Sequence, residues 1–168
     1  MRGYLDIETA YDGSITTIGI YRPDRGTIQL VGGGISDLSL YAALEGVETI
    51  VTFNGSGFDL PQIRRHMACD LKLGFAHLDL MYVCRRRGLR GGLKRVEQIL
   101  EIPRLTEGIS GSDAPRLWYR YDVQGDPQAL ALLLAYNRED VINLALLEAK
   151  LGLIEPQPLD ESIDVVLA

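Results

Sequence analysis

The 168-residue chain has only two cysteines and two histidines. Cys69 and Cys84 form no Cys-x-x-Cys pair and no Cys/His cluster, so the sequence predicts neither a disulfide framework nor a zinc site. No apolar stretch reaches the roughly 18 residues that a membrane span needs. The chain opens on Met1-Arg2-Gly3, which is too polar for a signal peptide. We therefore expect a cytoplasmic protein that makes no membrane contact.

Basic residues are also in deficit, because 17 Lys and Arg stand against 23 Asp and Glu, for a net charge of -6. This balance argues against a general nucleic-acid binder. With 46% hydrophobic and 24% charged residues, disordered and collagen-like chains are excluded, and one globular domain with a substantial core is expected. The sequence contains no internal repeat and no low-complexity tract.

Five segments have the length and composition of strands: residues 4–8, 15–21, 27–31, 48–53 and 76–82. Short turns join the first three, which favours an antiparallel meander. Predicted helices at 37–44 and 59–67 precede the last two strands, which indicates crossovers to parallel neighbours. We therefore expect a mixed five-stranded α/β sheet with helices on both faces.

The second half of the chain has a helical pattern. Leu93, Val96, Ile99 and Leu100 share one face of a predicted helix that ends before Pro103. A loop is expected over 104–116, followed by an aromatic helix around 117–121.

The last predicted helix begins at the Asp126-Pro127 pair, a good N-cap and first position, and runs to about Leu151, before Gly152. Residues 154–168 hold two prolines and four acids. We expect them to form an acidic tail, loosely docked or disordered, after a domain over 1–153.

The first candidate site is Asp6-Ile7-Glu8. Alternate residues of a strand face the same way, so Asp6 and Glu8 project together while Leu5 and Ile7 project from the other face. Two carboxylates on one face repel each other unless a cation lies between them. The alternative is that Glu8 marks a solvated strand end.

The second candidate is Asn54-Gly-Ser-Gly-Phe-Asp59, which follows a buried strand and opens a helix. Open α/β sheets place ligands at the carboxyl ends of their strands, so Asp59 is a candidate metal ligand. The simpler interpretation is that Asn54 and Asp59 are ordinary turn and N-cap residues.

The third candidate is the pair Tyr136 and Asp140 in the long helix. A spacing of four residues places both side chains on one face, beside the apolar stripe. Such a carboxylate needs a partner, and the tyrosine hydroxyl can hydrogen-bond a water next to it. The alternative partner for Asp140 is a nearby Lys or Arg.

Together and in this order, the three patterns resemble the DEDD superfamily of 3′ to 5′ exonucleases on the ribonuclease-H-like fold. The tyrosine branch (DEDDy) has Asp-x-Glu, then Asn before an aromatic-Asp pair, then Tyr-x-x-x-Asp. The matching residues here are Asp6, Glu8, Asn54, Phe58, Asp59, Tyr136 and Asp140. The chain is most similar to predicted exonucleases of this fold known largely from bacteria and archaea, over about residues 1–153.

The resemblance implies two Mg²⁺ or Mn²⁺ ions held by the four acids, in a two-metal hydrolysis of phosphodiester bonds. Asp6 would bridge both ions, Glu8 and Asp140 would complete the site of the ion that activates water, and Tyr136 would orient that water. Asp59 would serve the second ion. A site with oxygen ligands alone suits Mg²⁺. A fifth acid, Asp79, is expected to support the site structurally.

Basic residues are concentrated in 62–95, where nine stand against two acids, while the remainder of the chain has a net charge of -13. The segment from Arg85 to Arg95, which includes Gly88, Gly91 and Gly92, is expected to form a flexible basic loop that leads into a helix N-terminus, a setting that favours phosphate. The candidate nucleic-acid contacts there are Arg85, Arg86, Arg87, Arg90 and Lys94. The alternative is a solvated charged connector.

The sequence therefore predicts a metal-dependent 3′ to 5′ exonuclease acting on a single-stranded DNA or RNA end. One alternative is a catalytically weak module that binds nucleic acid or a partner protein. Another is a hydrolase of small phosphate esters at the same two-metal site. Trp118, Tyr119 and Tyr121 could stack on a base, but aromatic residues at helical spacing are more often core residues.

Overall fold

The computed structural model describes residues 1–67, 69–106 and 108–167. Ala68, Glu107 in the predicted loop and Ala168 at the end of the predicted tail lie outside the described residues. Within the described part, no helix has the length and apolar character needed to cross a membrane.

One mixed sheet forms the centre of the molecule, with its strands in the order β5-β4-β1-β2-β3-β6. The strands are β1 (Arg2–Thr9), β2 (Ile15–Arg22), β3 (Gly26–Val31), β4 (Thr49–Thr52), β5 (Ala76–Asp79) and β6 (Ile163–Val166). β1, β2 and β3 pair antiparallel, and β4 and β5 extend the sheet in parallel from β1. The predicted meander and parallel neighbours are confirmed, whereas the expected number of five strands is wrong because β6 adds a sixth.

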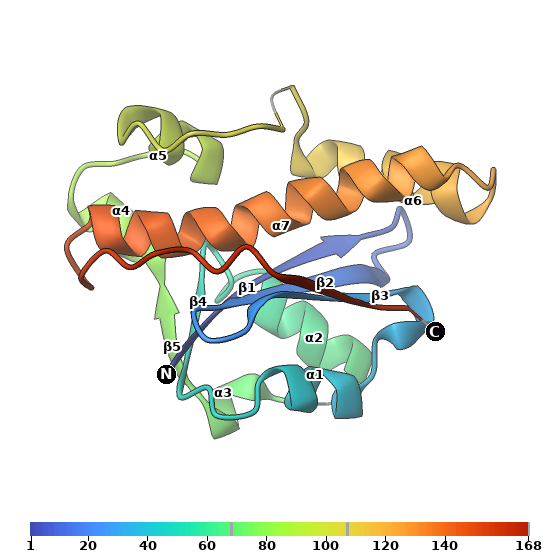
Figure 1. Ribbon diagram of the computed structural model, residues 1–168, viewed down its shortest axis with the longest axis horizontal. Helices are drawn as coiled ribbons and strands as arrows, with labels where there is room; N and C mark the ends of the chain where they lie inside the picture. Colours follow the sequence, from blue (N-terminus) through green and yellow to red (C-terminus); the bar gives the residue numbers. More distant parts are fainter. Residues whose placement is uncertain (68, 107, 168) are drawn as a thin grey trace.

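Helices cover both faces of this sheet (Figure 1). They are α1 (Asp37–Ala43), α2 (Asp59–Met67), α3 (Leu71–Gly74), α4 (Leu80–Arg86), α5 (Leu93–Ile99), α6 (Ala114–Asp122) and α7 (Pro127–Lys150), with short 3-10 turns at η1 (Gly32–Gly34) and η2 (Gly111–Asp113). Figure 1 shows α7 crossing one face with α4, α5 and α6 around it, while α1, α2 and α3 lie on the other.

The alternation along β1 divides the core in two. Leu5 and Ile7 pack in an apolar cluster with α1 and α2, and Tyr4 packs in a second cluster with α4, α5 and α7. Since side chains alternate, Asp6 follows Tyr4 toward the α7 face. The predicted orientation of the first candidate site is therefore observed.

The long helix α7 begins as predicted, because the Asp126 carboxylate accepts hydrogen bonds from the Gln128 and Ala129 amides at 3.0 and 3.2 Å. The predicted strand over 76–82 is wrong after Asp79. The Asp79 carboxylate accepts from the Met81 amide at 3.1 Å and caps α4, which turns the apolar run that follows into a helix.

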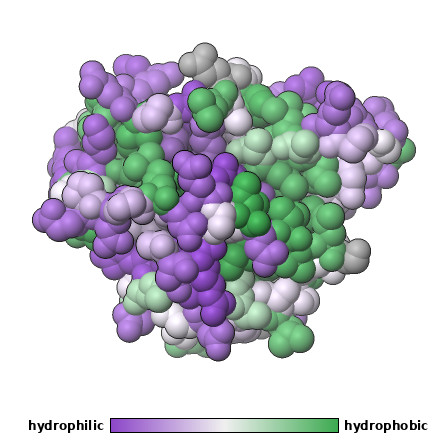
Figure 2. All heavy atoms as spheres, in the orientation of Figure 1, coloured by the Kyte–Doolittle hydropathy of each residue, from purple (hydrophilic) through white to green (hydrophobic). Residues whose placement is uncertain are grey.

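The C-terminal segment is also more ordered than expected. β6 pairs with β3 in parallel, and the Asp160 amide donates to the Tyr21 hydroxyl at 3.1 Å. Arg138 of α7 donates to the carbonyl of Glu161 at 3.0 Å, so backbone hydrogen bonds hold a segment whose composition suggested disorder. Figure 2 shows hydrophobic residues gathered on the right half of this face. Ile163 of β6 is half exposed.

The predicted loop over 104–116 ends earlier than expected. The turn η2 and the start of α6 lie inside this range, and Pro115 occupies the first turn of α6, where its missing amide is not needed. α6 therefore extends beyond the predicted 117–121 at both ends.

Candidate functional site

The carboxyl half of β1 carries the first two acids. β4 pairs with β1 only from Arg2 to Tyr4, so Asp6 and Glu8 lie beyond the carboxyl end of β4. This is the edge at which open α/β sheets bind ligands. Glu8 is buried, whereas Asp6 is partly exposed.

The helix α7 brings the third acid to the same place. Asp140 and Tyr136 are both buried on the side of α7 that faces β1. One carboxylate oxygen each from Asp6, Glu8 and Asp140 lies within 4.8 Å of the others, close enough to share one metal ion. The structure thus brings together acids that are more than 130 residues apart in the sequence.

The side chain of Asn137 fixes Asp6 in this cluster. Its amide donates to the Asp6 carboxylate at 3.2 Å and to the Asp6 carbonyl at 3.3 Å, and its own oxygen accepts from Gln29 at 3.0 Å. Gly19, the β2 partner of Asp6, makes this possible, since a Cβ there would come within 2.2 Å of the Asn137 oxygen. The sequence analysis did not identify this role of Asn137; a glycine inside a strand was the available signal.

Asp59 lies at the start of α2, next to this cluster but not in it. Its carboxylate accepts a hydrogen bond from the Ile7 amide at 3.1 Å, which ties α2 to the centre of β1. Asp59 and Glu8 line the same hollow of about 270 Å³, together with Asp6 and Asp140. Asp59 is therefore close enough to the other three acids to contribute to the site.

Buried negative charge dominates the electrostatics of the cluster. Burial, followed by the neighbouring Asp140 carboxylate, raises the pKa of Asp6 and of Glu8 well above its ordinary value. Burial also raises the pKa of Asp59 to about 7. The pKa of Asp140 is raised by burial as well, against the opposing effect of the Arg104 guanidinium. Such a group of carboxylates favours a bound divalent cation.

Tyr136 contributes a hydroxyl and an aromatic face. Burial and the adjacent Asp140 carboxylate raise the pKa of the Tyr136 hydroxyl, so it stays protonated at neutral pH. The ammonium of Lys94 lies 4.7 Å from the ring centroid, and the guanidinium of Arg104 lies 5.4 Å from it.

The loop between β4 and α2 forms one wall of the site. Asn54 has a positive φ of 67°, and its amide donates to Asp79 at 2.8 Å; the Ser56 amide donates to the same carboxylate at 3.0 Å. Asp79 thus supports the loop structurally, in keeping with the role expected for it. Asn54 is exposed and lines the cleft, and Phe58, also exposed, lines the hollow beside Asp59.

A cleft of about 600 Å³ opens in front of the carboxylates. Asp6, Tyr136 and Asp140 line it, and so do Arg85 of α4 and Lys94 of α5. Two of the five candidate basic contacts therefore line the same cleft as the acidic residues.

The other three candidate basic residues, Arg86, Arg87 and Arg90, are exposed and lie outside the residues that line this cleft. Arg87 donates to the carbonyl of Leu151 at the end of α7, which gives it a structural contact. Arg85 and Arg86 belong to α4, so the expected flexible basic loop is shorter than predicted.

Arg104 is a site residue that sequence reasoning missed. Its guanidinium forms ion pairs with Asp140 and with Glu97 of α5, and Glu97 is buried. Asp140 therefore has the arginine partner that the sequence analysis gave as an alternative. It also remains part of the carboxylate cluster. No local pattern predicts a contact between residues 36 positions apart.

Of the candidate stacking residues, Trp118 packs against a small apolar cluster of α6 and α7 that includes Leu117 and Leu133. Its ring also lies 5.4 Å from that of Tyr121. Tyr119 is exposed on α6. Trp118 is therefore a core residue, as the alternative to base stacking predicted.

The fold and the carboxylate cluster define an α/β protein with an acidic site at the carboxyl end of its central strands. The family model of the RNase_H superfamily matches residues 3–152, and the chain belongs to this superfamily. The uncharacterized protein YprB of Bacillus subtilis (strain 168) is 34% identical over 108 residues, which cover 58% of this chain and 26% of that protein. The chain thus matches about a quarter of this relative's length.

Among solved structures, the family B DNA polymerase of the archaeon Pyrobaculum calidifontis is similar, with a TM-score of 0.70 and 18% identity over 90% of this chain and 24% of the polymerase. The EXD2 exonuclease domain gives a TM-score of 0.39 at 14% identity, over 95% of this chain and 86% of that domain. The superfamily and the polymerase similarity confirm the ribonuclease-H-like fold, and the superfamily points to a nuclease in general.

Proposed function

We propose that this chain is a metal-dependent 3′ to 5′ exonuclease of the DEDDy type that acts on single-stranded DNA or RNA ends. The observation that carries the proposal is the cluster of Asp6, Glu8 and Asp140, with ligand oxygens within 4.8 Å of one another beside a cleft that basic residues also line. Tyr136, one helical turn before Asp140, completes the arrangement expected of this branch.

The acids fit Mg²⁺ or Mn²⁺. All candidate ligands are carboxylate oxygens, which these hard cations prefer, and their raised pKa values mark negative charge that the protein only partly balances. Asp6, Glu8 and Asp140 would hold one ion, and Asp6 with Asp59 a second. When bound, such ions polarise a water and stabilise the leaving 3′ oxygen.

The remaining residues bind and orient. The Tyr136 hydroxyl, which its raised pKa keeps protonated, donates a hydrogen bond that orients the attacking water rather than removing its proton. Arg85 and Lys94 line the same cleft as Asp6 and Asp140 and can contact backbone phosphates.

The size of the cleft supports a single strand end as substrate. A volume of about 600 Å³ is in the range of small-ligand sites and accommodates a nucleotide rather than a duplex. Outside residues 62–95 the chain is strongly acidic, which disfavours extended contact with long duplex DNA.

The proposal is tested by digesting 5′-labelled and 3′-labelled DNA and RNA oligonucleotides in Mg²⁺ or Mn²⁺. A 3′ to 5′ exonuclease releases the 3′ label at once as a mononucleotide and shortens the 5′-labelled strand progressively. Asp6→Asn should abolish this activity, whereas Asp164→Asn, an exposed acid on β6, should not. Binding of oligonucleotides without cleavage would support a binding module instead, and turnover of mononucleotides alone would support a small phosphate esterase.

A further inference from the structure

Arg104 is the least expected residue of the site. It lies in the segment between α5 and η2, its side chain is 10% exposed, and it contacts Asp140. Because burial of a charged side chain is costly, other residues must hold Arg104 in place, and its charge must affect what the site binds.

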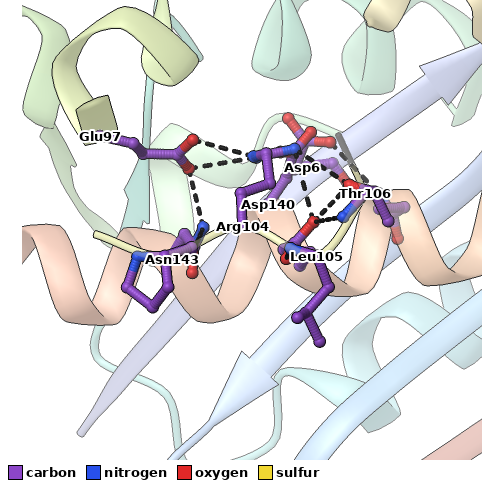
Figure 3. Close-up of polar contacts among 10 residues, drawn as sticks. Asp6, Glu97, Arg104, Leu105, Thr106, Asp140 and Asn143 are labelled. Carbon is purple, nitrogen blue, oxygen red and sulfur yellow. Dashed lines mark hydrogen bonds and ion pairs between the residues drawn. The ribbon is translucent and has the colours of Figure 1, made fainter. Parts of the chain in front are cut away.

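Residues of α5 and α7 hold Arg104 in place. The Nε and Nη2 atoms of Arg104 donate to the Glu97 carboxylate at 2.9 and 3.1 Å, in a bidentate pair. Asn143 of α7 donates to the same carboxylate at 3.0 Å. Figure 3 shows Glu97 between Asn143 and the guanidinium, with Asp140 and Asp6 on the guanidinium's other side.

The segment that carries Arg104 is held as well. Glu139 of α7 accepts hydrogen bonds from the amides of Leu105 and Thr106, the latter at 2.9 Å. Glu139 and Asp140 are consecutive, so one turn of α7 fixes both the segment and the carboxylate that Arg104 contacts. The guanidinium is therefore preorganised and does not depend on Asp140 alone for its position.

Arg104 also has donors to spare. Of its five N–H groups, three are accounted for by Glu97 and Asp140. Among the described residues, Nη1 donates to the Thr106 hydroxyl at 3.5 Å and lies 3.9 Å from a Glu139 carboxylate oxygen. Arg104 lines a hollow of about 680 Å³ that shares Lys94 and Ser110 with the cleft in front of the carboxylates. Arg104 does not line the cleft itself, but it contacts Asp140 and lies 5.4 Å from the ring of Tyr136, and both of these residues do.

We propose that Arg104 contacts the phosphate of the substrate and, together with Lys94, supplies the positive charge on the α5 side of the site. The inference rests on the proposed function and deepens it by naming the group that recognises the reacting phosphate. Nη1 is held only by a long hydrogen bond and a long ion pair among the described residues, so it can turn to a phosphate oxygen, and the charge of the planar guanidinium acts strongly because the site is buried.

The test uses thymidine 5′-monophosphate, a product-like probe, and measures its affinity by calorimetry in saturating Mn²⁺. Removing Arg104 alone would leave Glu97 as a buried unpaired charge, so Arg104→Met is compared in a Glu97→Gln background. Arg104→Lys, which keeps the charge, is the second variant. Arg25→Met, in an exposed pair with Glu45, controls for the loss of one positive charge.

Arg104→Met with Glu97→Gln should bind the nucleotide at least about tenfold more weakly than Glu97→Gln alone, as loss of a charged hydrogen bond predicts. The nucleotide affinity of Arg104→Lys should lie between those of wild type and the double variant. Arg25→Met should bind the nucleotide as tightly as wild type. Affinity for Mn²⁺ alone should not fall, because a positive charge beside the ligands has been removed.

Nucleotide affinities within about twofold would overturn the inference. So would a parallel fall in Mn²⁺ affinity, which would show that Arg104 only orients Asp140. A wild-type protein that binds the nucleotide through Arg104 but cuts no oligonucleotide would contradict the proposed exonuclease and leave this inference standing.

Discussion

The buried carboxylates make the stability of the metal-free protein depend on pH in an unusual direction. Acids whose pKa is raised by folding bind protons more tightly in the folded state, so the free energy of unfolding falls as pH rises. For Asp59 the window runs from its ordinary value of 3.8 to about 7 in the folded protein. Asp6 and Glu8, whose pKa values are also raised, act in the same direction.

The magnitude follows from the pKa of Asp59. Between pH 5 and pH 7 the Asp59 carboxyl is ionised in the unfolded state and protonated in the folded state. Over this range the free energy of unfolding falls by about 1.4 kcal/mol per pH unit. Asp59 alone therefore lowers the free energy of unfolding by on the order of 3 kcal/mol between pH 5 and pH 8. This is a large share of the stability of a single domain.

Urea unfolding in EDTA at pH 5 and pH 8 measures this difference. The matched variant is Asp59→Asn, because an asparagine oxygen can still accept from the Ile7 amide while carrying no charge. Wild type should lose more stability than Asp59→Asn over this range. Excess Mn²⁺ should restore wild type more at pH 8 than at pH 5, since the cation competes with protons for the carboxylates. A free energy of unfolding that is flat or rises with pH in EDTA would refute the reasoning.

Three further substitutions test individual contacts. Gly19→Ala places a Cβ against Asn137 and should lower the free energy of unfolding in urea by about 1–3 kcal/mol. It should also weaken Mn²⁺ binding. An unchanged Mn²⁺ affinity would argue against the Asn137 contact to Asp6. Asp79→Ala removes the cap of α4 and the anchor of Asn54, so we expect the free energy of unfolding to fall by about 1–2 kcal/mol. The KM for oligonucleotides should rise. An unchanged KM would show that the loop between β4 and α2 does not touch substrate. Tyr136→Phe keeps the ring between Lys94 and Arg104 and should lower kcat by about 10²-fold at unchanged Mn²⁺ affinity, whereas a kcat near wild type would remove the hydroxyl from the mechanism.

Much of this site follows from local periodicity. Alternation along β1 places Asp6 and Glu8 on one face, and helical spacing places Tyr136 beside Asp140, so each half of the site is encoded within a few residues. That the two halves meet in one site was expected from the resemblance to the DEDD exonucleases, and not from the local patterns themselves.

The contacts that complete the site depend on tertiary structure. Arg104 meets Glu97 and Asp140 only after α5 packs beside α7, and charged residues in a loop ordinarily remain solvated. Asn137 reaches Asp6 because Gly19 leaves space in a neighbouring strand, which no pattern within α7 reveals.

The errors in the fold have similar causes. The apolar residues after Asp79 fit a strand or a helix equally well, and the capping hydrogen bond to Met81 decides for the helix. β6 has a weak intrinsic signal beside two prolines and several acids, and it forms because the edge of β3 offers backbone partners.

The most direct test is the rate of mononucleotide release from a single-stranded oligonucleotide in Mn²⁺, compared among wild type, Asp140→Asn and the exposed control Asp164→Asn. Loss of one metal-ligand carboxylate should lower this rate by on the order of 10³-fold, and EDTA should abolish it in wild type. Asp164→Asn should cut at the wild-type rate. Equal rates in wild type and Asp140→Asn, or cleavage that persists in EDTA, would contradict a metal-dependent nuclease site at these carboxylates.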